Sequence, residues 1–280
     1  MAESQLAANR FEESSLRLRG VPVLVYHGLA EREMVNVPLR ERKYWLQNGQ
    51  FKEHLDHLHN LGFQVRRLEE LWRQGAALLR QPSRAVITFD DGLSSAYQIA
   101  YPLLREAGME ADFFVNPATI GRPGFLTWAQ MAEMQRGGMS FQSHSYDHVY
   151  LTWLAKGPLE QQLRRSKQTL EDRLGQQVDF LSVPFGDLNE RVVQVARQEG
   201  YLAVCSSWSW PARPGSSVVS RVGIDRRTTL REFIRLLTGS PGTYLIRAAK
   251  GCLKFLPKRL VLRLRPSPPP LGYRTSLEEK

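Results

Sequence analysis

The stretch AVITFDDG, residues 85–92, decides the fold of this chain. Its first five residues are apolar or β-branched without interruption, a pattern that predicts a buried strand. A helical pattern follows over residues 94–107. A strand that returns through a loop and a helix is the repeating unit of a parallel sheet.

The same unit recurs on both sides of this stretch. Apolar runs predict strands at 21–26, 111–115, 139–142, 178–183 and 202–205, and helical spacing predicts helices at 51–61, 128–136, 157–174 and 188–199. Six or seven such units in about 220 residues favour a barrel, complete or distorted, over an open sheet. We therefore predict an α/β protein with one (β/α) barrel-like domain over residues 21–240.

Composition excludes several classes of protein. With 42% hydrophobic and 24% charged residues, the chain of 280 residues is typical of a folded domain. No run approaches the roughly 20 apolar residues of a membrane-spanning helix. Two cysteines, Cys205 and Cys252, are too few for a disulfide scaffold or a thiolate metal site. Residues 1–20 are polar and lack an apolar signal-peptide core, so we expect a mobile leading segment and a cytoplasmic protein.

The net charge of +10 is concentrated near the end of the sequence. Nine basic residues and no acidic residue lie between Phe233 and Leu277, so the rest of the chain is almost neutral. Over residues 241–265, apolar and basic positions fall on different sides of a helical pattern. The apolar ones are Leu245, Ile246, Ala249, Cys252, Leu253 and Leu256, and the basic ones are Arg247, Lys250, Lys254 and Lys258.

This basic amphipathic segment suits the anionic surface of a membrane. We expect peripheral contact through residues 243–265 at the inner face of the cytoplasmic membrane. The alternative is a final helix that packs on the barrel with a solvated basic face. The sequence carries no nucleic-acid-binding motif, so no specific nucleic-acid partner is expected. Residues 266–280 begin with a proline-rich run and form a polar tail.

Two adjacent carboxylates, Asp90 and Asp91, follow the strand at 85–89. Active sites of such barrels lie at the carboxyl ends of the strands. Like charges so close together are unfavourable unless a cation or a shared proton relieves them. The alternative is an Asp-Asp-Gly turn in which Asp91 caps a helix that begins near Leu93.

Two histidines four residues apart, His144 and His148, follow the strand expected at 139–142. This spacing places both imidazoles on one face of a helical turn, where they can hold one metal ion. Both strand ends would meet at the same mouth of the barrel. Two imidazoles and one carboxylate form a catalytic metal site, and the second carboxylate remains available as a base.

The same residues carry a resemblance to a known family. Residues 88–92 and 144–148 resemble the first two motifs of the polysaccharide deacetylases, the NodB-homology carbohydrate esterases of family 4. Residues 21–27 resemble the opening strand of a subgroup that includes deacetylases of biofilm polysaccharides. Residues 182–186 resemble its third motif, and 200–204 and 220–222 resemble later elements. The similarity extends from about residue 20 to residue 240 and implies the distorted (β/α) barrel of the NodB type.

The resemblance implies a role for each matched residue. Asp91, His144 and His148 would bind one divalent metal ion, usually zinc, with cobalt or nickel as alternatives. Asp90 would be the general base that takes a proton from metal-bound water. The backbone N–H of Phe185 would stabilise the oxyanion. Cleavage of an N-acetyl group would release acetate and leave a free sugar amine.

The sequence departs from the family pattern at two places. Many members have an arginine two residues before the proline of the third motif, where this chain has Ser182. The late histidine that serves the family as general acid is absent, because no histidine follows His148. We predict that His27, at the end of the first strand, replaces it, with Asp225 as a second candidate. The alternative for His27 is a structural role in the core.

Further residues suggest contacts to a sugar ring. Trp208 and Trp210 follow the strand at 202–205 and would form a platform for the apolar face of a pyranose, unless they pack over the barrel end. The resemblance adds Pro184 as a substrate contact. Three histidines share one expected helix, where we predict a solvated face; they are His54, His57 and His59.

Together these features predict a metal-dependent hydrolase that removes the N-acetyl group of an amino sugar in a polysaccharide, an oligosaccharide or a lipid-linked glycan. One alternative is a deformylase or amidase for another acyl-amino substrate. A second alternative is a carbohydrate-binding pseudoenzyme, which the absence of the late histidine would explain.

Overall fold

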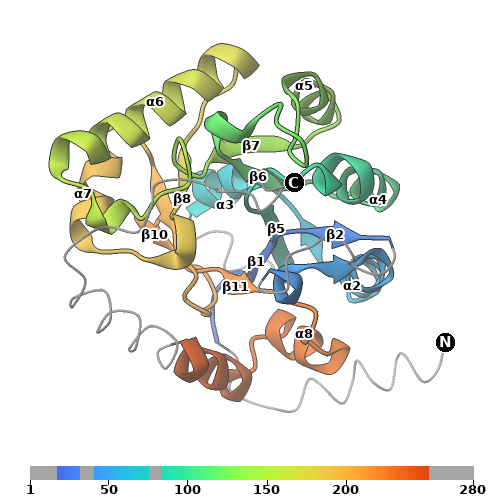
Figure 1. The fold of residues 1–280 in the computed structure, drawn as a ribbon. Helices are drawn as coiled ribbons and strands as arrows, with labels where there is room; N and C mark the ends of the chain where they lie inside the picture. Colours follow the sequence, from blue (N-terminus) through green and yellow to red (C-terminus); the bar gives the residue numbers. More distant parts are fainter. Residues whose placement is uncertain (1–17, 32–40, 76–82, 252–280) are drawn as a thin grey trace, which may run out of the picture.

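The computed structural model describes residues 18–31, 41–75 and 83–251. Its main sheet is parallel and has the strand order β10–β9–β8–β7–β6–β5–β1–β11, with β4 paired to β5 off this path (Figure 1). The strands are β1 Val23–Tyr26, β4 Gln64–Val65, β5 Arg84–Phe89, β6 Asp112–Val115, β7 Ser140–Ser143, β8 Phe180–Ser182, β9 Ala203–Cys205, β10 Val218–Val219 and β11 Val222–Gly223. A separate pair consists of β2 Leu29–Ala30 and β3 Leu46–Gln47. The predicted α/β class is confirmed.

One segment, residues 218–223, brings the two edges of the sheet together. Its first part is β10, which pairs with β9, and its last part is β11, which pairs with β1. Only Ser220 and Arg221 separate the two strands. The sheet is therefore curled into a distorted barrel, and side chains that point into it from strands that are not neighbours can meet.

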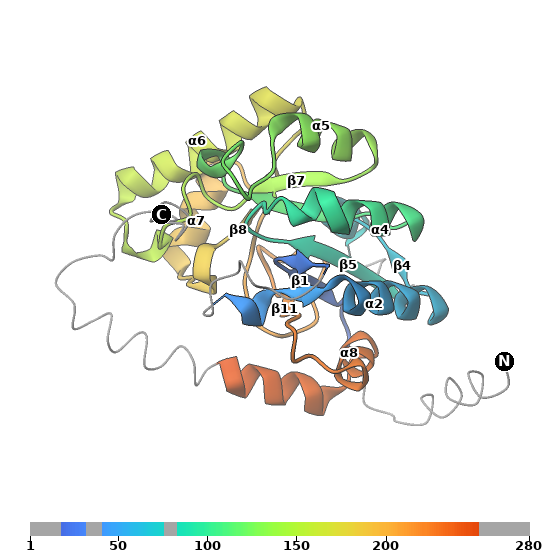
Figure 2. The same cartoon turned by 45° about the vertical axis from the view of Figure 1, so that its right-hand side comes forward.

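Helices surround this sheet (Figures 1 and 2). They are α2 Asn48–Asn60, α3 Leu68–Gln74, α4 Tyr101–Glu106, α5 Trp128–Arg136, α6 Lys156–Leu174, α7 Glu190–Gln198 and α8 Leu230–Leu237, and a last helix covers residues 241–251. α5 has the predicted bounds, and α6 begins one residue earlier than predicted. The helix expected over 94–107 is interrupted, because residues Ala96–Ala100 form a π-helical segment before α4.

Both faces of the sheet are buried, which explains the uninterrupted apolar run of β5. Ile87 and Phe89 belong to a large cluster that the surrounding helices complete. Val86 points the other way, into a smaller cluster that includes Leu68 and Leu71 of α3. A strand that is covered on both sides has no polar face to alternate with, so its sequence reads as continuously apolar.

His54 corrects the prediction of a solvated histidine face on α2. Its ring stacks on Phe233 of α8 with centroids 4.0 Å apart, and its Nδ1 lies 3.2 Å from the Tyr26 hydroxyl. Burial lowers the pKa of His54 to about 4, so the ring is a neutral core group. Only His57 and His59 of the three reach solvent, because the core-facing side of the helix includes position 54.

Several sequence expectations lie outside the described residues. These are the leading segment over residues 1–17, the greater part of the basic segment, residues 252–265, and the proline-rich tail over 266–280. Within the described ranges, no helix is both long and apolar enough to cross a membrane.

Candidate metal and catalytic site

Asp90 and Asp91 lie at the carboxyl end of β5, at the mouth of the barrel. The Asp90 N–H still donates to the Tyr26 oxygen of β1 at 3.0 Å. Asp91 and Gly92 then adopt left-handed backbone angles, with φ of 75° and 69°. A Cβ on Gly92 would lie 3.0 Å from Val115 Cγ1, so this turn favours glycine. The sharp turn directs the two neighbouring carboxylates toward different partners.

The loop that carries His144 and His148 is irregular, which corrects the predicted helical turn. It follows β7, and Ser145 and His148 adopt positive φ angles of 64° and 58° within it. The Asn116 side-chain amide donates to the backbone oxygens of His144 and Ser145 and holds the loop in place. Two left-handed residues, rather than helical periodicity, therefore bring the imidazoles together.

Both imidazoles converge on one oxygen of Asp91. The Nε2 atoms of His144 and His148 lie 3.3 Å and 3.4 Å from Asp91 Oδ1. The candidate ligand atoms of the three residues all lie within 4.8 Å of one another. The helix-capping role considered for Asp91 is wrong, because the next helical segment begins only at Ala96.

This donor set fits a divalent metal ion. His144 Nδ1 lies 2.9 Å from the Ser182 backbone oxygen, an acceptor that places the proton on Nδ1 and leaves the Nε2 lone pair directed at Asp91. Two imidazole nitrogens and one carboxylate oxygen match the three protein ligands of catalytic zinc sites. These three residues could therefore hold one such ion.

The electrostatics of Asp91 and His148 agree with that role. At His144, burial lowers the pKa, but the neighbouring carboxylates of Asp90 and Asp91 outweigh this effect and raise it. Burial raises the pKa of Asp91, but the two imidazoles outweigh this effect and hold the pKa well below its usual range. Burial lowers the pKa of His148. The carboxylate is therefore ionised near pH 7 and the His148 ring is neutral, which are the forms that bind a cation.

Asp90 has a different partner, the fully buried Arg221 between β10 and β11. Arg221 Nη1 donates to Asp90 Oδ1 and Nη2 donates to Asp90 Oδ2, both at 2.7 Å. The guanidinium also donates to the hydroxyls of Ser182 at 2.7 Å and Thr88 at 3.2 Å. Burial raises the pKa of Asp90, but Arg221, together with His144 and His27, more than offsets this effect, so the pKa is lowered. Asp90 is thus an ionised, oriented carboxylate that can accept a proton.

Arg221 is a site residue that the sequence analysis missed. The resemblance suggests an arginine at position 182, but the small Ser182 stands there and donates to Asp90 Oδ2 at 3.1 Å. Arg221 reaches the same carboxylate from the seam of the barrel. A signal was present in the sequence, because Arg221 stands within the apolar run of residues 218–222, and a buried arginine requires an anionic partner.

His27 follows β1 directly and lies beside Asp90, because the strand register pairs Tyr26 with Phe89. The ring stacks on Tyr44 of the turn Arg42–Tyr44 with centroids 5.0 Å apart. Its buried Nδ1 has no hydrogen-bond partner among the described residues. Core polar atoms are almost always paired, so this observation favours a role of His27 in the site over a structural one.

An aromatic wall stands next to the metal-binding residues; we define it as Phe185, Tyr150 and Trp153. Phe185 lies in the turn Pro184–Gly186, has φ of 62° and is 43% exposed. Its ring centroid is 4.6 Å from that of His148 and 4.0 Å from that of Tyr150, on which it stacks. Trp153 continues the row, 5.6 Å from Tyr150. The sequence analysis missed Tyr150 and Trp153.

Strained backbone also concentrates here. Five non-glycine residues in the described ranges have positive φ, and four belong to this site: Asp91, Ser145, His148 and Phe185. Such conformations cost free energy and persist where the surrounding structure fixes them, which is typical of functional sites.

The other predicted contacts are less closely connected to the metal-binding residues. Trp210 packs on Tyr244 of the last helix, with ring centroids 6.0 Å apart. Trp208 is 52% exposed, and its backbone N–H donates to the Ser206 hydroxyl. Asp225 accepts from the Arg227 N–H at 2.9 Å within its own loop. Pro184 is buried beside Phe185.

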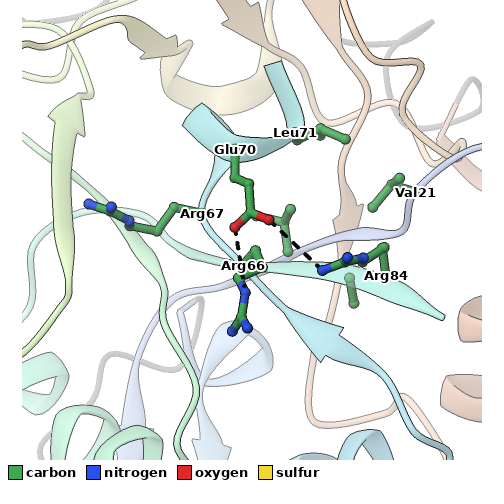
Figure 3. A pocket seen from close by; sticks show the side chains of 8 residues that line it. Val21, Arg66, Arg67, Glu70, Leu71 and Arg84 are labelled. Carbon is green, nitrogen blue, oxygen red and sulfur yellow. Dashed lines mark ion pairs between the residues drawn. The ribbon is translucent and has the colours of Figure 1, made fainter. Parts of the chain in front are cut away.

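A small pocket lies near the amino end of β5, away from this site (Figure 3). It surrounds Glu70, whose carboxylate lies 3.5 Å from Arg66 Nε and 3.9 Å from Arg84 Nη1. Its volume of about 10 Å³ is room for about one water molecule. Because Arg84 and Asp90 stand at opposite ends of the strand, this pocket is separate from the carboxylate pair.

Comparisons with known proteins agree with the geometry. Residues 80–204 match the family model described as polysaccharide deacetylase. YxkH of Bacillus subtilis, whose name assigns it to the polysaccharide deacetylases, is 33% identical over 187 residues, which are 65% of this chain and 62% of that protein. The peptidoglycan-N-acetylglucosamine deacetylase of Bacillus cereus is 29% identical over 143 residues, 49% of this chain and 64% of that protein. The chain spans less than two thirds of the length of these relatives.

Solved structures share the fold. The Streptococcus pyogenes deacetylase PplD, in complex with acetate, has a TM-score of 0.72 and 24% identity, over 81% of this chain and 100% of that chain. IcaB from Ammonifex degensii has a TM-score of 0.67 and 23% identity, over 80% and 98% of the two chains. These likenesses confirm the predicted distorted barrel of the NodB type.

Proposed function

Residues 80–204 match the polysaccharide deacetylase family model, and from this similarity we propose that the chain is a metal-dependent hydrolase of the N-acetyl amide of an amino sugar. The substrate would be a polysaccharide, an oligosaccharide or a lipid-linked glycan. The observation that carries the proposal is that two adjacent carboxylates have different partners. Asp91 faces two imidazoles, and Asp90 faces an arginine. One group is suited to a metal ion and the other to a proton.

Asp91, His144 and His148 would hold one divalent ion. Two imidazoles in the set favour zinc over magnesium or calcium, with cobalt and nickel as alternatives. A bound ion of this kind supplies a Lewis acid and lowers the pKa of water at the site. The Ser182 oxygen fixes the orientation of the His144 ring, so this ligand needs no rearrangement to bind.

Asp90 would take the proton that the attacking water loses. The bidentate pair with Arg221 fixes both carboxylate oxygens, and the lowered pKa keeps the group ionised across the neutral range. An oriented base of this kind contributes about 10²- to 10⁴-fold to the rate.

His27 would donate a proton to the leaving nitrogen, and the Phe185 N–H would donate a hydrogen bond to the amide oxygen as negative charge develops. The unpaired Nδ1 of His27 and its position beside Asp90 support this role. In the complete reaction one water is consumed and the amide C–N bond breaks. The acetyl carbon gains a C–O bond, and the products are acetate and a free sugar amine.

Acetate release from oligomers of N-acetylglucosamine by the zinc-loaded protein tests the proposal. We expect release that a chelator abolishes and added zinc restores. Asp90→Asn should lower the rate about 10²- to 10⁴-fold while zinc content stays at that of the wild type. Asp56→Asn, at an exposed position on α2, is the matched control and should change neither quantity.

Two outcomes would replace this function by the alternatives. Release of formate from N-formyl sugars, without release of acetate from N-acetyl sugars, would identify a deformylase. Glycan binding without release of any acyl group, unchanged in Asp90→Asn, would identify a carbohydrate-binding pseudoenzyme.

A further inference from the structure

The last helix, residues 241–251, packs on the domain through a polar and aromatic face. Tyr244 is fully buried, and its hydroxyl donates to the Leu236 oxygen at 3.0 Å. Arg247 Nε donates to Glu232 Oε1 at 2.7 Å, and its Nη2 donates to Thr228 Oγ1 at 2.9 Å. Arg247 therefore anchors this helix. The alternative of a final helix that packs on the barrel is confirmed for residues 241–251, but of its two basic residues only Lys250 is solvated, because Arg247 faces the domain.

The opposite face of the same helix is apolar and points to solvent. Leu245 and Ile246 are each 58% exposed, the highest exposure among the large hydrophobic side chains of the described ranges. Ala249 and Lys250 are also exposed. The helix thus buries its arginine and presents its aliphatic residues, the reverse of the arrangement expected for a helix that only covers a soluble domain.

The sequence of this helix and of the segment after it is basic. From Phe233 to Leu277 the sequence holds nine basic residues and no acidic one. Apolar residues continue at helical spacing after Ala249, in the order Cys252, Leu253 and Leu256, although these lie outside the described residues. Aliphatic side chains that alternate with lysines favour a surface that is both apolar and negatively charged.

We propose that Leu245, Ile246 and Ala249 dock on an anionic lipid bilayer, with Lys250 placed at the headgroups. Aliphatic residues enter the boundary between headgroups and acyl chains, and each basic residue adds electrostatic attraction to anionic lipid. A second copy of this chain is a weaker candidate, because a symmetric contact would bring two positively charged segments together. This inference does not depend on the proposed hydrolase activity.

Contacts with the barrel hold the helix in this orientation. Arg247 Nη1 donates to the backbone oxygen of Gly223, which pairs with Val25 of β1 at the seam of the barrel. The apolar face on the other side of the helix is therefore held away from the domain.

Sedimentation of the full-length protein with lipid vesicles tests this proposal. The vesicles are phosphatidylcholine alone, or phosphatidylcholine with about one third phosphatidylglycerol. We expect binding to the anionic vesicles that weakens as salt rises above about 0.15 M, because salt screens the attraction. The double variant L245S/I246S should bind at least about tenfold more weakly, and Lys250→Glu about tenfold more weakly on anionic vesicles only.

Leu202→Ser is the matched control, because Leu202 is 47% exposed but lies directly before β9, outside this helix. It should bind as the wild type does. All variants should keep the wild-type unfolding temperature within a few degrees, since the changed side chains are exposed. Equal binding of L245S/I246S and wild type, or a dimer in solution that the same double variant dissociates, would overturn the proposal.

Discussion

Asp90 and Asp91 are neighbours in the chain but lie in different chemical environments. Around Asp90 the protein supplies a permanent cation, because Arg221 holds both oxygens at 2.7 Å. Around Asp91 the partners are two imidazoles, 3.3 Å and 3.4 Å away, which can exchange their contacts for a shared metal ion. Arginine already neutralises the charge of the first carboxylate, whereas a carboxylate beside two imidazoles is suited to a cation from solution.

A third buried carboxylate, Asp112, shows what happens without either kind of partner. It begins β6, and its Oδ2 accepts from the Leu68 N–H at 2.8 Å. Burial raises the pKa of Asp112 to about 7. The pKa of an aspartate at this sheet is therefore lowered or raised, depending on the partners that the tertiary structure places beside it.

Replacing each of the two site carboxylates in turn should have the largest effect on activity. Asp91→Asn should lose the metal ion and reduce acetate release to background, because a neutral amide is a poor replacement for the only anionic ligand. Asp90→Asn should lose only the base function and keep the metal. Elemental analysis beside rate measurements separates the two. Equal metal loss in both variants would contradict the division of roles.

Removing Arg221 should test the ion pair between Arg221 and Asp90. Arg221→Met leaves Asp90 buried without a cation, which costs about 3–5 kcal/mol of unfolding free energy. The pKa of Asp90 should also rise, and the rate near pH 7 should fall with it. Urea unfolding measures the first effect, and the pH profile of the rate measures the second.

The double variant Asp90→Asn with Arg221→Met is the control for this pair. It removes both charges, so it should regain most of the lost stability, although activity stays low. A double variant that is as unstable as the sum of the two single variants would show that Arg221 stabilises the barrel through packing rather than through Asp90.

The pH dependence of stability should distinguish Asp112 from the paired carboxylates. The folded pKa of about 7 lies above the unfolded value, so the folded state binds the proton more tightly and Asp112 favours folding at low pH. This contribution is lost as the pH rises through about 7. The stability of Asp112→Asn relative to the wild type should therefore rise by about 2–3 kcal/mol between pH 5 and pH 8, because about two pH units of the titration lie above pH 5.

Urea unfolding of both proteins at several pH values measures this difference. His54 has a lowered pKa of about 4, so its effect has the opposite sign, but it is present in both proteins and cancels in the comparison. A constant difference in stability from pH 5 to pH 8 would exclude a titrating Asp112.

The aromatic wall should give the smallest effect. Tyr150 stacks on Phe185 beside the site, so Tyr150→Ala should raise KM about three- to tenfold and leave kcat nearly unchanged, the cost of one lost aromatic contact. Tyr97→Ala is the matched control, because the Tyr97 hydroxyl donates to Glu133 of α5. A fall in kcat without a change in KM would instead place Tyr150 in the chemical step.

Local patterns predicted the elements well and the contacts between them poorly. The run 85–89 predicted a strand that the structure places at Arg84–Phe89, and helical spacing predicted α5 at its actual bounds. The spacing of His144 and His148 indicated one metal site but the wrong backbone, because positive φ at Ser145 and His148 depends on tertiary contacts such as the bonds from Asn116.

The sequence by itself determined the central strands from β5 to β9, the paired carboxylates at a strand end and the histidine pair, because each depends on residues close together in the chain. It did not predict β10 and β11, which close the barrel. Only the tertiary structure decided which cation each carboxylate meets. Arg221 is 131 residues from Asp90 and reaches it only because residues 218–223 close the barrel. Likewise, Arg247 faces inward because Glu232 and Thr228 stand beside it. The partner of a buried charge is set by distance in space, and the local periodicity of the sequence carries no information about that distance.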